Sequence, residues 1–436
     1  MHQITRRHLL KLGLGGAALL AAGSPAKALV EIVVSGGDFV PLPIAIPDFA
    51  SSDPTFGREV ADIVRANLAR SGLFAPLDPN SLPARVGDVN NEPAFADWRA
   101  INVDALVMGQ VERGGQIQSA VRVWDTQAAQ QVIGNNYAAD PQTYRRIAHI
   151  VSDAIYASLA GDKGYFDTQI VFVAESGPKA NRKKQIALMD QDGANVTPLS
   201  SGNSLALTPR LSVSNAMITY VSYEDGNPQV YVAQLGGKSR KLVNGAQASF
   251  ASRFAPDNST LAFSVSAGGI TNIYSASASG GKPVQLTSGS AIDTSPCYSP
   301  DGTKIVFESD RGGQPQLYVM GANGGGAQRI SYGDGTYSTP VWSPKGDLIA
   351  YTRQSGGQFQ IGTMRPDGSG ERILVSSFHA EGPTFCPNGR VIMFFRDPGG
   401  DSGPGLFTVD IWGRNEQPIK LDTYASDPAW GSYRTA

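Results

Sequence analysis

Cysteine and histidine are scarce in this sequence. Its 436 residues include two cysteines, Cys297 and Cys386, and four histidines. Two cysteines cannot form a four-ligand zinc site by themselves. They fall in sequence repeats that we place two apart, whereas the Cα atoms of a disulfide lie within roughly 7 Å of each other. We therefore predict two free, buried thiols, no metal site and no bound cofactor.

Motifs for catalysis or nucleotide binding are also missing. The sequence has no Gly-x-Ser-x-Gly elbow, no Gly-x-x-x-x-Gly-Lys phosphate loop and no His-Glu-x-x-His zinc motif. Beyond the N-terminal segment described next, the only histidines are His149 and His379. We expect His149 to be a packing or surface residue of a helix. His379 lies in a loop before Pro383, where a functional role stays open. These absences leave only a weak signal for catalysis.

Apolar runs are short, and the one from Leu12 to Ala22 lies near the N-terminus. It is too short to span a membrane. It follows Thr5-Arg6-Arg7-His8-Leu9-Leu10-Lys11 and precedes Ala26-Lys27-Ala28, which is the pattern of an export signal cleaved between Ala28 and Leu29. The paired arginines resemble a twin-arginine signal, with an ordinary Sec signal as the alternative. We expect residues 1–28 to be removed on export.

The sequence carries no excess of positive charge. Its formal net charge is −2, and loss of residues 1–28 removes four basic residues and no acidic ones, which leaves −6. A chain of net negative charge is not attracted to nucleic acid or to anionic lipid. We therefore predict no nucleic-acid partner, and contact with membranes only through other proteins.

Six related segments of about 44 residues fill the second half of the sequence. The clearest copy reads Ser295-Pro296-Cys297-Tyr298-Ser299-Pro300-Asp301-Gly302 and continues into the apolar Ile305-Val306-Phe307. The prolines Pro256, Pro300, Pro344 and Pro387 are 44, 44 and 43 residues apart. Each unit reads as four short strands separated by Pro-Asp-Gly and Gly-rich turns. A repeat of this length and composition is typical of a β-propeller blade.

The two ends of the repeat region complement each other. Ile170 to Val173 begins at the second strand of a unit, and Asp427-Pro428-Ala429-Trp430 supplies the missing first strand at the C-terminus. Pairing of these ends closes a ring and removes exposed sheet edges. We therefore predict a six-bladed propeller over residues 166–436, in preference to an open β-solenoid.

Residues 44–160 have a different sequence pattern from the repeats. Apolar residues at helical spacing predict helices at 58–71 and 142–160, and alternating residues predict strands at 105–111, 119–124 and 131–137. This length suffices for a separate α/β domain. With a linker at 161–165, we predict a mainly β protein in which a small α/β domain precedes a six-bladed β-propeller.

Residues 29–43 form a predicted N-terminal arm. Val30, Ile32 and Val34 alternate with other residues, and Ser35-Gly36-Gly37 and several prolines follow. The alternation fits an ordinary edge strand. It fits equally an arm that docks on a partner, for example by strand addition.

This organisation resembles the TolB family, the periplasmic propeller proteins of the Tol–Pal system. The resemblance includes Pro43-Ile44-Ala45-Ile46-Pro47-Asp48-Phe49, Ala66-Asn67-Leu68-Ala69-Arg70-Ser71-Gly72-Leu73-Phe74 and Asp104-Ala105-Leu106-Val107-Met108-Gly109-Gln110-Val111. The blade motif alone is not specific, because peptidases of the prolyl oligopeptidase class carry similar blades. The N-terminal segments make it specific, and it covers essentially the whole chain after residue 28.

The resemblance implies a monomeric, non-enzymatic adaptor in the periplasm. TolB proteins bind the lipoprotein Pal at one mouth of the propeller and TolA through the N-terminal arm, and the system supports outer-membrane integrity and invagination during cell division. Carried over residue by residue, Pal contacts are expected at Ala251, Asp293, Thr294, Ser295, Ser338, Thr339, Ala380, Glu381, Ser426 and Asp427. TolA contacts are expected at Glu31, Ile32, Val33 and Val34. Ala248 and Ser252 replace a histidine and a proline of the family's pattern, which leaves contacts on that blade open.

Two other functions fit a propeller. One is an exported hydrolase or lactonase that uses carboxylates of the channel, such as Asp293, Glu381 and Asp427, with or without Ca²⁺. The missing nucleophile elbow and the missing hydrolase domain argue against a peptidase. The other is a purely structural protein of the cell envelope.

Overall fold

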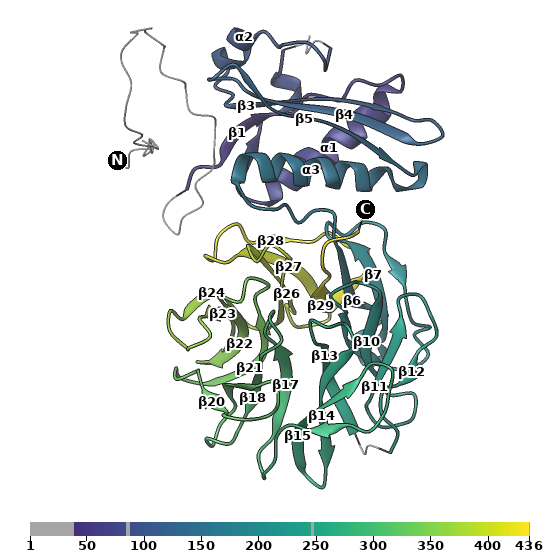
Figure 1. Ribbon diagram of the computed structural model, residues 1–436, viewed down its shortest axis with the longest axis vertical. Helices are drawn as coiled ribbons and strands as arrows, with labels where there is room; N and C mark the ends of the chain where they lie inside the picture. The colour runs from purple at the N-terminus through teal and green to yellow at the C-terminus, as the bar shows by residue number, and fades with distance from the viewer. Residues whose placement is uncertain (1–38, 84–87, 246–247, 436) are drawn as a thin grey trace, which may run out of the picture. The chain divides into compact units, whose positions relative to one another are not determined.

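The computed structural model describes residues 39–83, 88–245 and 248–435, and it divides the chain into two compact units, residues 1–163 and 164–436. The described part of the first unit contains a five-stranded sheet with helices, and the second contains six four-stranded sheets (Figure 1). The protein is therefore mainly β, with an N-terminal α/β region and a six-bladed β-propeller, as the sequence predicts.

The sheet of the first unit has the strand order β2-β1-β3-β4-β5. β1 runs parallel to β2 and β3, whereas β4 runs antiparallel to both β3 and β5. Leu42 and Pro43, which we assigned to the arm, lie in β1 and pair with Phe74 and Ala75. The strands are β1 (Leu42–Ala45), β2 (Phe74–Pro76), β3 (Ala105–Glu112), β4 (Ile117–Asp125) and β5 (Gln130–Ala139).

Two long helices, α1 (Pro54–Arg70) and α3 (Tyr144–Ala160), pack against each other and on the sheet. α1 begins four residues before the predicted start, because Asp53 accepts hydrogen bonds from the N–H groups of Thr55 and Phe56 and Pro54 suits the first turn. The short α2 (Phe95–Ala100) lies on the other side of the sheet (Figure 1). There Trp98 packs with Leu106 and Met108.

Each blade of the propeller is an antiparallel sheet whose strands we give from the inner to the outer one. Blades 1 to 3 are β29 (Tyr424–Trp430), β6 (Gln169–Ser176), β7 (Lys183–Asp190), β8 (Thr197–Pro198); β9 (Ala206–Leu211), β10 (Met217–Ser222), β11 (Gln229–Gln234), β12 (Arg240–Lys241); and β13 (Ala248–Phe254), β14 (Thr260–Ala267), β15 (Ile270–Ser277), β16 (Val284–Gln285). Blades 4 to 6 are β17 (Asp293–Tyr298), β18 (Lys304–Ser309), β19 (Gln316–Gly321), β20 (Gln328–Arg329); β21 (Thr336–Trp342), β22 (Ile349–Ser355), β23 (Gln358–Met364), β24 (Arg372–Ser377); and β25 (Ala380–Phe385), β26 (Val391–Arg396), β27 (Gly405–Asp410), β28 (Gln417–Pro418).

The C-terminal strand completes the first blade. β29 pairs with β6, so that Ala425 faces Ala174 and Ala429 faces Val171. Figure 1 shows the yellow β29 beside the teal β6. The predicted closure of the ring by the C-terminal segment is therefore confirmed.

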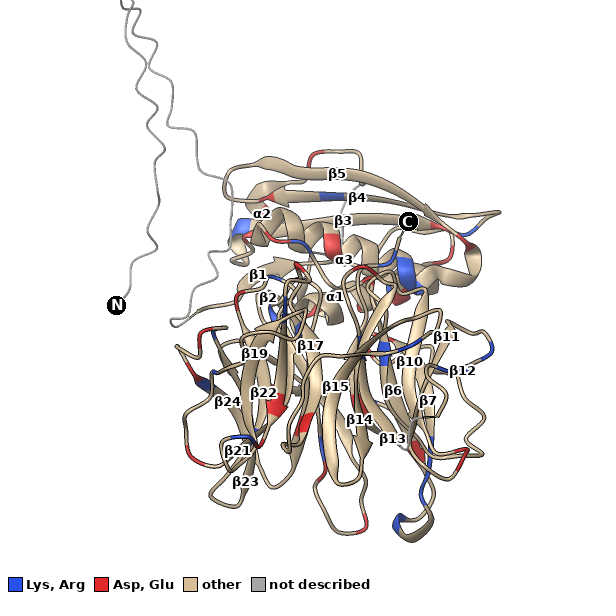
Figure 2. Cartoon of the chain, turned by 60° about the horizontal axis from the view of Figure 1, so that its bottom comes forward, with Lys and Arg blue, Asp and Glu red and all other residues tan. Residues whose placement is uncertain are grey.

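Apolar residues on facing blades hold the ring together. One cluster joins blades 4, 5 and 6 and includes the fully buried Tyr351, Ile392 and Phe394. Burying one such side chain contributes roughly 1.5–3 kcal/mol of hydrophobic stabilisation. Charged residues are found both on the strands and in the loops of the propeller (Figure 2).

The two cysteines are free thiols, as predicted. Both are buried, and each sulfur accepts a backbone N–H: Cys297 from Trp342 at 3.4 Å and Cys386 from Val391 at 3.2 Å. Burial raises the pKa of the Cys386 thiol to about 11. A buried thiol that stays protonated is unreactive, so Cys386 serves packing.

None of the helices in residues 39–83, 88–245 and 248–435 is long and apolar enough to cross a lipid bilayer.

Candidate binding surface at the channel mouth

The six inner strands all begin at the same end of the ring, and we call this end the channel mouth. Near it, the six strands share one distortion. In each strand the pairing with the second strand shifts register, as a β-bulge does, and two residues are left between the paired positions. The first of those two residues always has a positive φ, between 47° and 65°: Thr208, Ala251, Ser295, Thr339, Gly382 and Asp427. We call these six the bulge residues.

Five of the six bulge residues are not glycine. The left-handed conformation costs a residue with a Cβ atom roughly 1–2 kcal/mol. In five blades the next residue is a proline, which disfavours the right-handed helical conformation in the residue before it. Repeated backbone strain of this kind is found at functional sites, because a bulge directs side chains that a regular strand would not.

The structure brings all ten predicted Pal contacts to the channel mouth. Four of them are bulge residues: Ala251, Ser295, Thr339 and Asp427. Four others directly precede a bulge residue: Thr294, Ser338, Glu381 and Ser426. Asp293 and Ala380 are the first residues of β17 and β25. The predicted residues thus share one end of the ring across five blades.

Three of these ten residues are buried, which limits them to supporting roles. Ala380 is fully buried, and Ser426 donates a hydrogen bond to the buried Glu175. Asp293 is 1% exposed, and both of its carboxylate oxygens accept from Arg311 Nη2 at 3.0 Å. Asp293 therefore anchors the loop of Arg311 rather than facing solvent.

Charged groups of both signs meet deeper in the ring. Burial lowers the pKa of Arg210 to about 9, Arg253 adds to the effect, and the carboxylate of Asp427 opposes it. Burial also raises the pKa of Asp427, while Arg210 and a hydrogen bond from the Thr208 N–H lower it. A small cavity of about 60 Å³ lies between the inner strands here and is lined by Arg210, Arg253 and neighbouring residues.

The opposite side of the mouth is acidic. Burial, together with the charges of Glu381 and Asp310, raises the pKa of Glu308 to about 7, although the Thr339 N–H donates to the Glu308 carboxylate and opposes the shift. Burial likewise raises the pKa of Glu381, and His379 opposes that shift. His379 Nε2 lies 3.5 Å from Glu381 Oε2. The mouth therefore presents carboxylates that take up protons more readily than exposed ones.

His379 is fixed by its surroundings. Its ring lies between those of Phe359 and Phe395, with centroid distances of 4.8 and 5.7 Å. The sequence left a role for this residue open. The structure places it at the mouth, where it pairs with the predicted contact residue Glu381.

Exposed apolar side chains stand where the inner strands of five of the six blades begin. We call them the apolar rim, and they are Leu205, Ile292, Tyr332, Phe378 and Tyr424. Tyr332 and Phe378 are each 72% exposed. Exposed apolar groups gathered around a polar centre are typical of protein-binding surfaces.

Sequence reasoning missed the apolar rim, Glu308 and Arg210. Leu205, Ile292 and Tyr424 stand three residues before Thr208, Ser295 and Asp427, and that regular spacing could have identified them. The other predicted sites, Glu31, Ile32, Val33 and Val34 for TolA and Ala28 and Leu29 for cleavage, lie outside the described residues, as does the export signal.

Comparisons with known proteins agree with this architecture. Residues 30–132 match the family description "TolB amino-terminal domain", and residues 156–434 match "TolB beta propeller domain". The crystal structure of TolB from Acinetobacter baumannii is similar, with a TM-score of 0.81 and 26% identity over 90% of this chain and 97% of that chain.

Two more distant structures are similar in fold alone. Hydrazine synthase of Kuenenia stuttgartiensis matches with a TM-score of 0.50 and 14% identity, over 62% of this chain and 47% of that chain. A chain of a nidogen/laminin complex also gives 0.50, at 8% identity, over 62% of this chain and all of its own length.

Proposed function

The chain belongs to the TolB family, whose members are components of the Tol–Pal system, and we propose that it binds Pal at the channel mouth and TolA through the part of the N-terminal arm that precedes β1. In this role it is a periplasmic adaptor that supports outer-membrane integrity and invagination during cell division. The observation that supports the Pal site best is the apolar rim around the bulge residues, since it combines exposed aromatic groups with polar ones.

The chemistry of the mouth suits a protein partner. Aromatic side chains such as Tyr332, Phe378 and Tyr424 supply large contact areas that are exposed in the free protein. Glu308 and Glu381 add acceptors or, when protonated, donors. We expect the partner to place an apolar group against the rim and basic or hydrogen-bonding groups over the carboxylates.

We propose that Ala251, Thr294, Ser295, Ser338, Thr339, Glu381 and Asp427 contact Pal, and that Asp293, Ala380 and Ser426 support those contacts from buried positions. For TolA we propose Glu31, Ile32, Val33 and Val34. We further propose that the chain acts as a monomer without enzymatic activity and that residues 1–28 direct its export with cleavage between Ala28 and Leu29.

Calorimetric titration with the soluble domain of Pal tests the Pal assignment. We expect saturable one-to-one binding to the chain that begins at Leu29. Absence of binding heat, at protein concentrations tenfold above the highest dissociation constant that the instrument resolves, would contradict the Pal assignment. The matched titration with TolA, repeated after removal of residues 29–38, tests the arm, because those residues precede β1 and their loss spares the sheet.

A further inference from the structure

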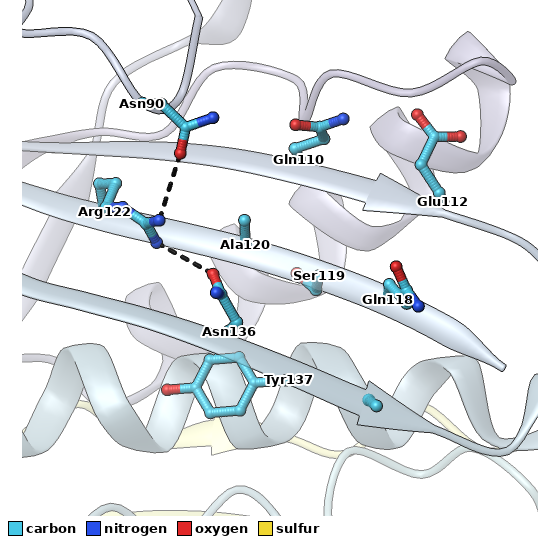
Figure 3. Close-up of a pocket in the computed structure, with 10 residues that line it drawn as sticks. Asn90, Gln110, Glu112, Gln118, Ser119, Ala120, Arg122, Asn136 and Tyr137 are labelled. Carbon is cyan, nitrogen blue, oxygen red and sulfur yellow. Dashed lines mark hydrogen bonds between the residues drawn. The ribbon is translucent and has the colours of Figure 1, made fainter.

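The face of the first unit's sheet that α2 covers in part also carries a polar groove of about 530 Å³. We call it the amide groove, and it is lined by Asn90, Gln110, Glu112, Gln118, Ser119, Ala120, Arg122, Asn136, Tyr137 and Ala138. All except Asn90 come from β3, β4 and β5, and the groove lies on the face opposite α1 and α3 (Figures 1 and 3). Neither the family match nor the proposed function assigns a role to this face.

Strand register explains why the face is hollow. Ala120 in β4 pairs with Gln110 in β3 on one side and with Asn136 in β5 on the other. The next row towards the strand ends pairs Glu112, Gln118 and Ala138. A methyl group therefore stands at the centre of longer polar side chains, which surround it in Figure 3. The small central residue leaves the floor free for a ligand.

Hydrogen bonds fix the orientation of the groove's amides. Arg122 donates to Asn136 Oδ1 and Asn90 Oδ1, each at 3.3 Å, and to the carbonyl oxygens of Val121 and Asn135 (Figure 3). Because a guanidinium can only donate, it holds both amide oxygens towards itself. The NH₂ group of Asn136 is then directed away from Arg122, and that of Asn90 is partly engaged by Asp88 at 3.2 Å.

Gln110 and Gln118 complete the groove with unused amides. In the described part of the chain, neither side chain has a hydrogen-bond partner. Glu112, the one carboxylate of the lining, accepts from the N–H and Oγ–H of Ser52. The two charged groups of the lining, Arg122 and Glu112, are thus opposite in sign and both already engaged within the protein.

We propose that the amide groove binds an uncharged, hydroxyl-rich ligand, a short stretch of carbohydrate. Planar amides offer a donor and an acceptor side by side, which matches the paired hydroxyl or acetamido groups of a sugar. The groove's volume lies in the usual range for small-ligand sites, but its polar lining differs from the apolar lining that most such sites have. An apolar ligand would leave the amides unpaired, and a charged ligand would find no free counter-charge.

Ligand-observed NMR and calorimetry on the full chain from Leu29 test the proposal, with chitotriose and maltotriose as probes. We expect at least one of the two to bind saturably at millimolar concentration. The double variant Gln110→Ala/Gln118→Ala should weaken binding at least fivefold, and it leaves the fold intact because those side chains have no internal partner. Arg122→Lys tests the positioning role, since it keeps the charge but cannot orient both asparagines.

Gln142→Ala is the matched control. Gln142 is an exposed glutamine of the 3-10 turn at Pro141–Thr143 and does not line the groove. Its replacement should leave sugar affinity within twofold of the original. Failure of both sugars to bind at 10 mM, or equal loss in Gln142→Ala and in the glutamine double variant, would overturn the proposal. So would binding of an extended peptide along edge strand β5 in place of either sugar. None of these results depends on Pal binding.

Discussion

The backbone N–H of Thr208 donates to Asp427 Oδ2 at 3.4 Å, although 219 residues separate the two in the sequence. Both are bulge residues with positive φ, and they belong to the inner strands of blades 2 and 1. Arg210 lies close enough to Asp427 to lower its pKa against the effect of burial. The carboxylate thus links the closing strand of the ring to the next blade and favours the charged form of Arg210.

Replacement of Asp427 by alanine should therefore destabilise the propeller. It removes the acceptor of the Thr208 N–H and the negative charge that favours the charged form of Arg210, and we expect a loss of about 2–3 kcal/mol in the free energy of unfolding. Urea denaturation measures the change. Asp401→Ala, at an exposed loop position, is the control and should change stability by less than about 0.5 kcal/mol. Equal effects of the two substitutions would show that the link contributes nothing.

Gly382 is the one glycine among the bulge residues, with φ of 65°. A Cβ atom there would lie 3.3 Å from the ring of Phe395. Gly382→Ala should cost about 1–2 kcal/mol, from the left-handed backbone together with this close contact. Gly405→Ala in the same blade is the matched control, because that glycine has no positive φ and its Cβ would meet only Phe407 at 3.7 Å. A loss of stability in Gly382→Ala that is no larger than the loss in Gly405→Ala would refute the claim that the backbone is strained at this bulge.

The ring and its closure could be predicted from sequence because they depend on local signals. Proline and glycine at fixed spacing mark the turns between strands, and the unpaired segment at Asp427–Trp430 matches the strand that Ile170–Val173 lacks. The position of the mouth followed from the same repeats, since every bulge residue but Ala251 stands directly before a proline.

Exposure at the mouth could not be predicted in the same way. Phe378 and Tyr332 look in sequence like core residues, and Asp293 looks like a surface carboxylate, yet their burial is the reverse. The register shift of each bulge alters which side chains face solvent, and the pattern of a single strand does not reveal it. The environment of Glu308 depends on Thr339 of the next blade, which is a tertiary contact.

Trp430 is expected to contribute strongly to closure of the ring. Its indole Nε1–H donates to Thr168 Oγ1 at 2.9 Å, and its ring packs edge-on against Tyr165 at 5.7 Å. Trp430→Ala should lower the free energy of unfolding by about 3–4 kcal/mol. Trp412→Ala removes an indole that contacts Arg390 and Arg414 in a turn, and it should cost about 1 kcal/mol. Thermal or urea unfolding of both variants measures these losses. A larger loss of stability in Trp412→Ala than in Trp430→Ala would contradict this prediction.

Glu308 should make stability depend on pH. Its pKa rises from the ordinary 4.5 to about 7 in the folded protein, so between these values the folded state binds more protons than the unfolded state. Stability therefore falls as pH rises from about 4.5 to 7. Glu308→Gln stays neutral and keeps an acceptor for the Thr339 N–H. The free energy of unfolding of this variant should exceed that of the original protein by about 1–2 kcal/mol at pH 8 and equal it at pH 4. A difference that is the same at both pH values would refute the assignment.

The apolar rim should contribute more to Pal binding than any other exposed apolar residues. Phe378 is 72% exposed at the mouth, whereas Val284 is 61% exposed in the outer strand β16, away from it. Because both side chains are already in water, neither Phe378→Ala nor Val284→Ala should change the unfolding temperature appreciably. Phe378→Ala should weaken Pal binding about tenfold or more, since an aromatic group buried at an interface contributes roughly 1–2 kcal/mol or more.

Calorimetric titration of the two variants separates the rim from a general surface effect. Val284→Ala should bind Pal as the original protein does, and the double variant Tyr332→Ala/Phe378→Ala should bind more weakly than Phe378→Ala alone. If all of these variants bind equally well, Pal contacts lie elsewhere on the propeller. If Pal binding is lost in Val284→Ala as well, the outer strands of the blades and not the mouth carry the interface.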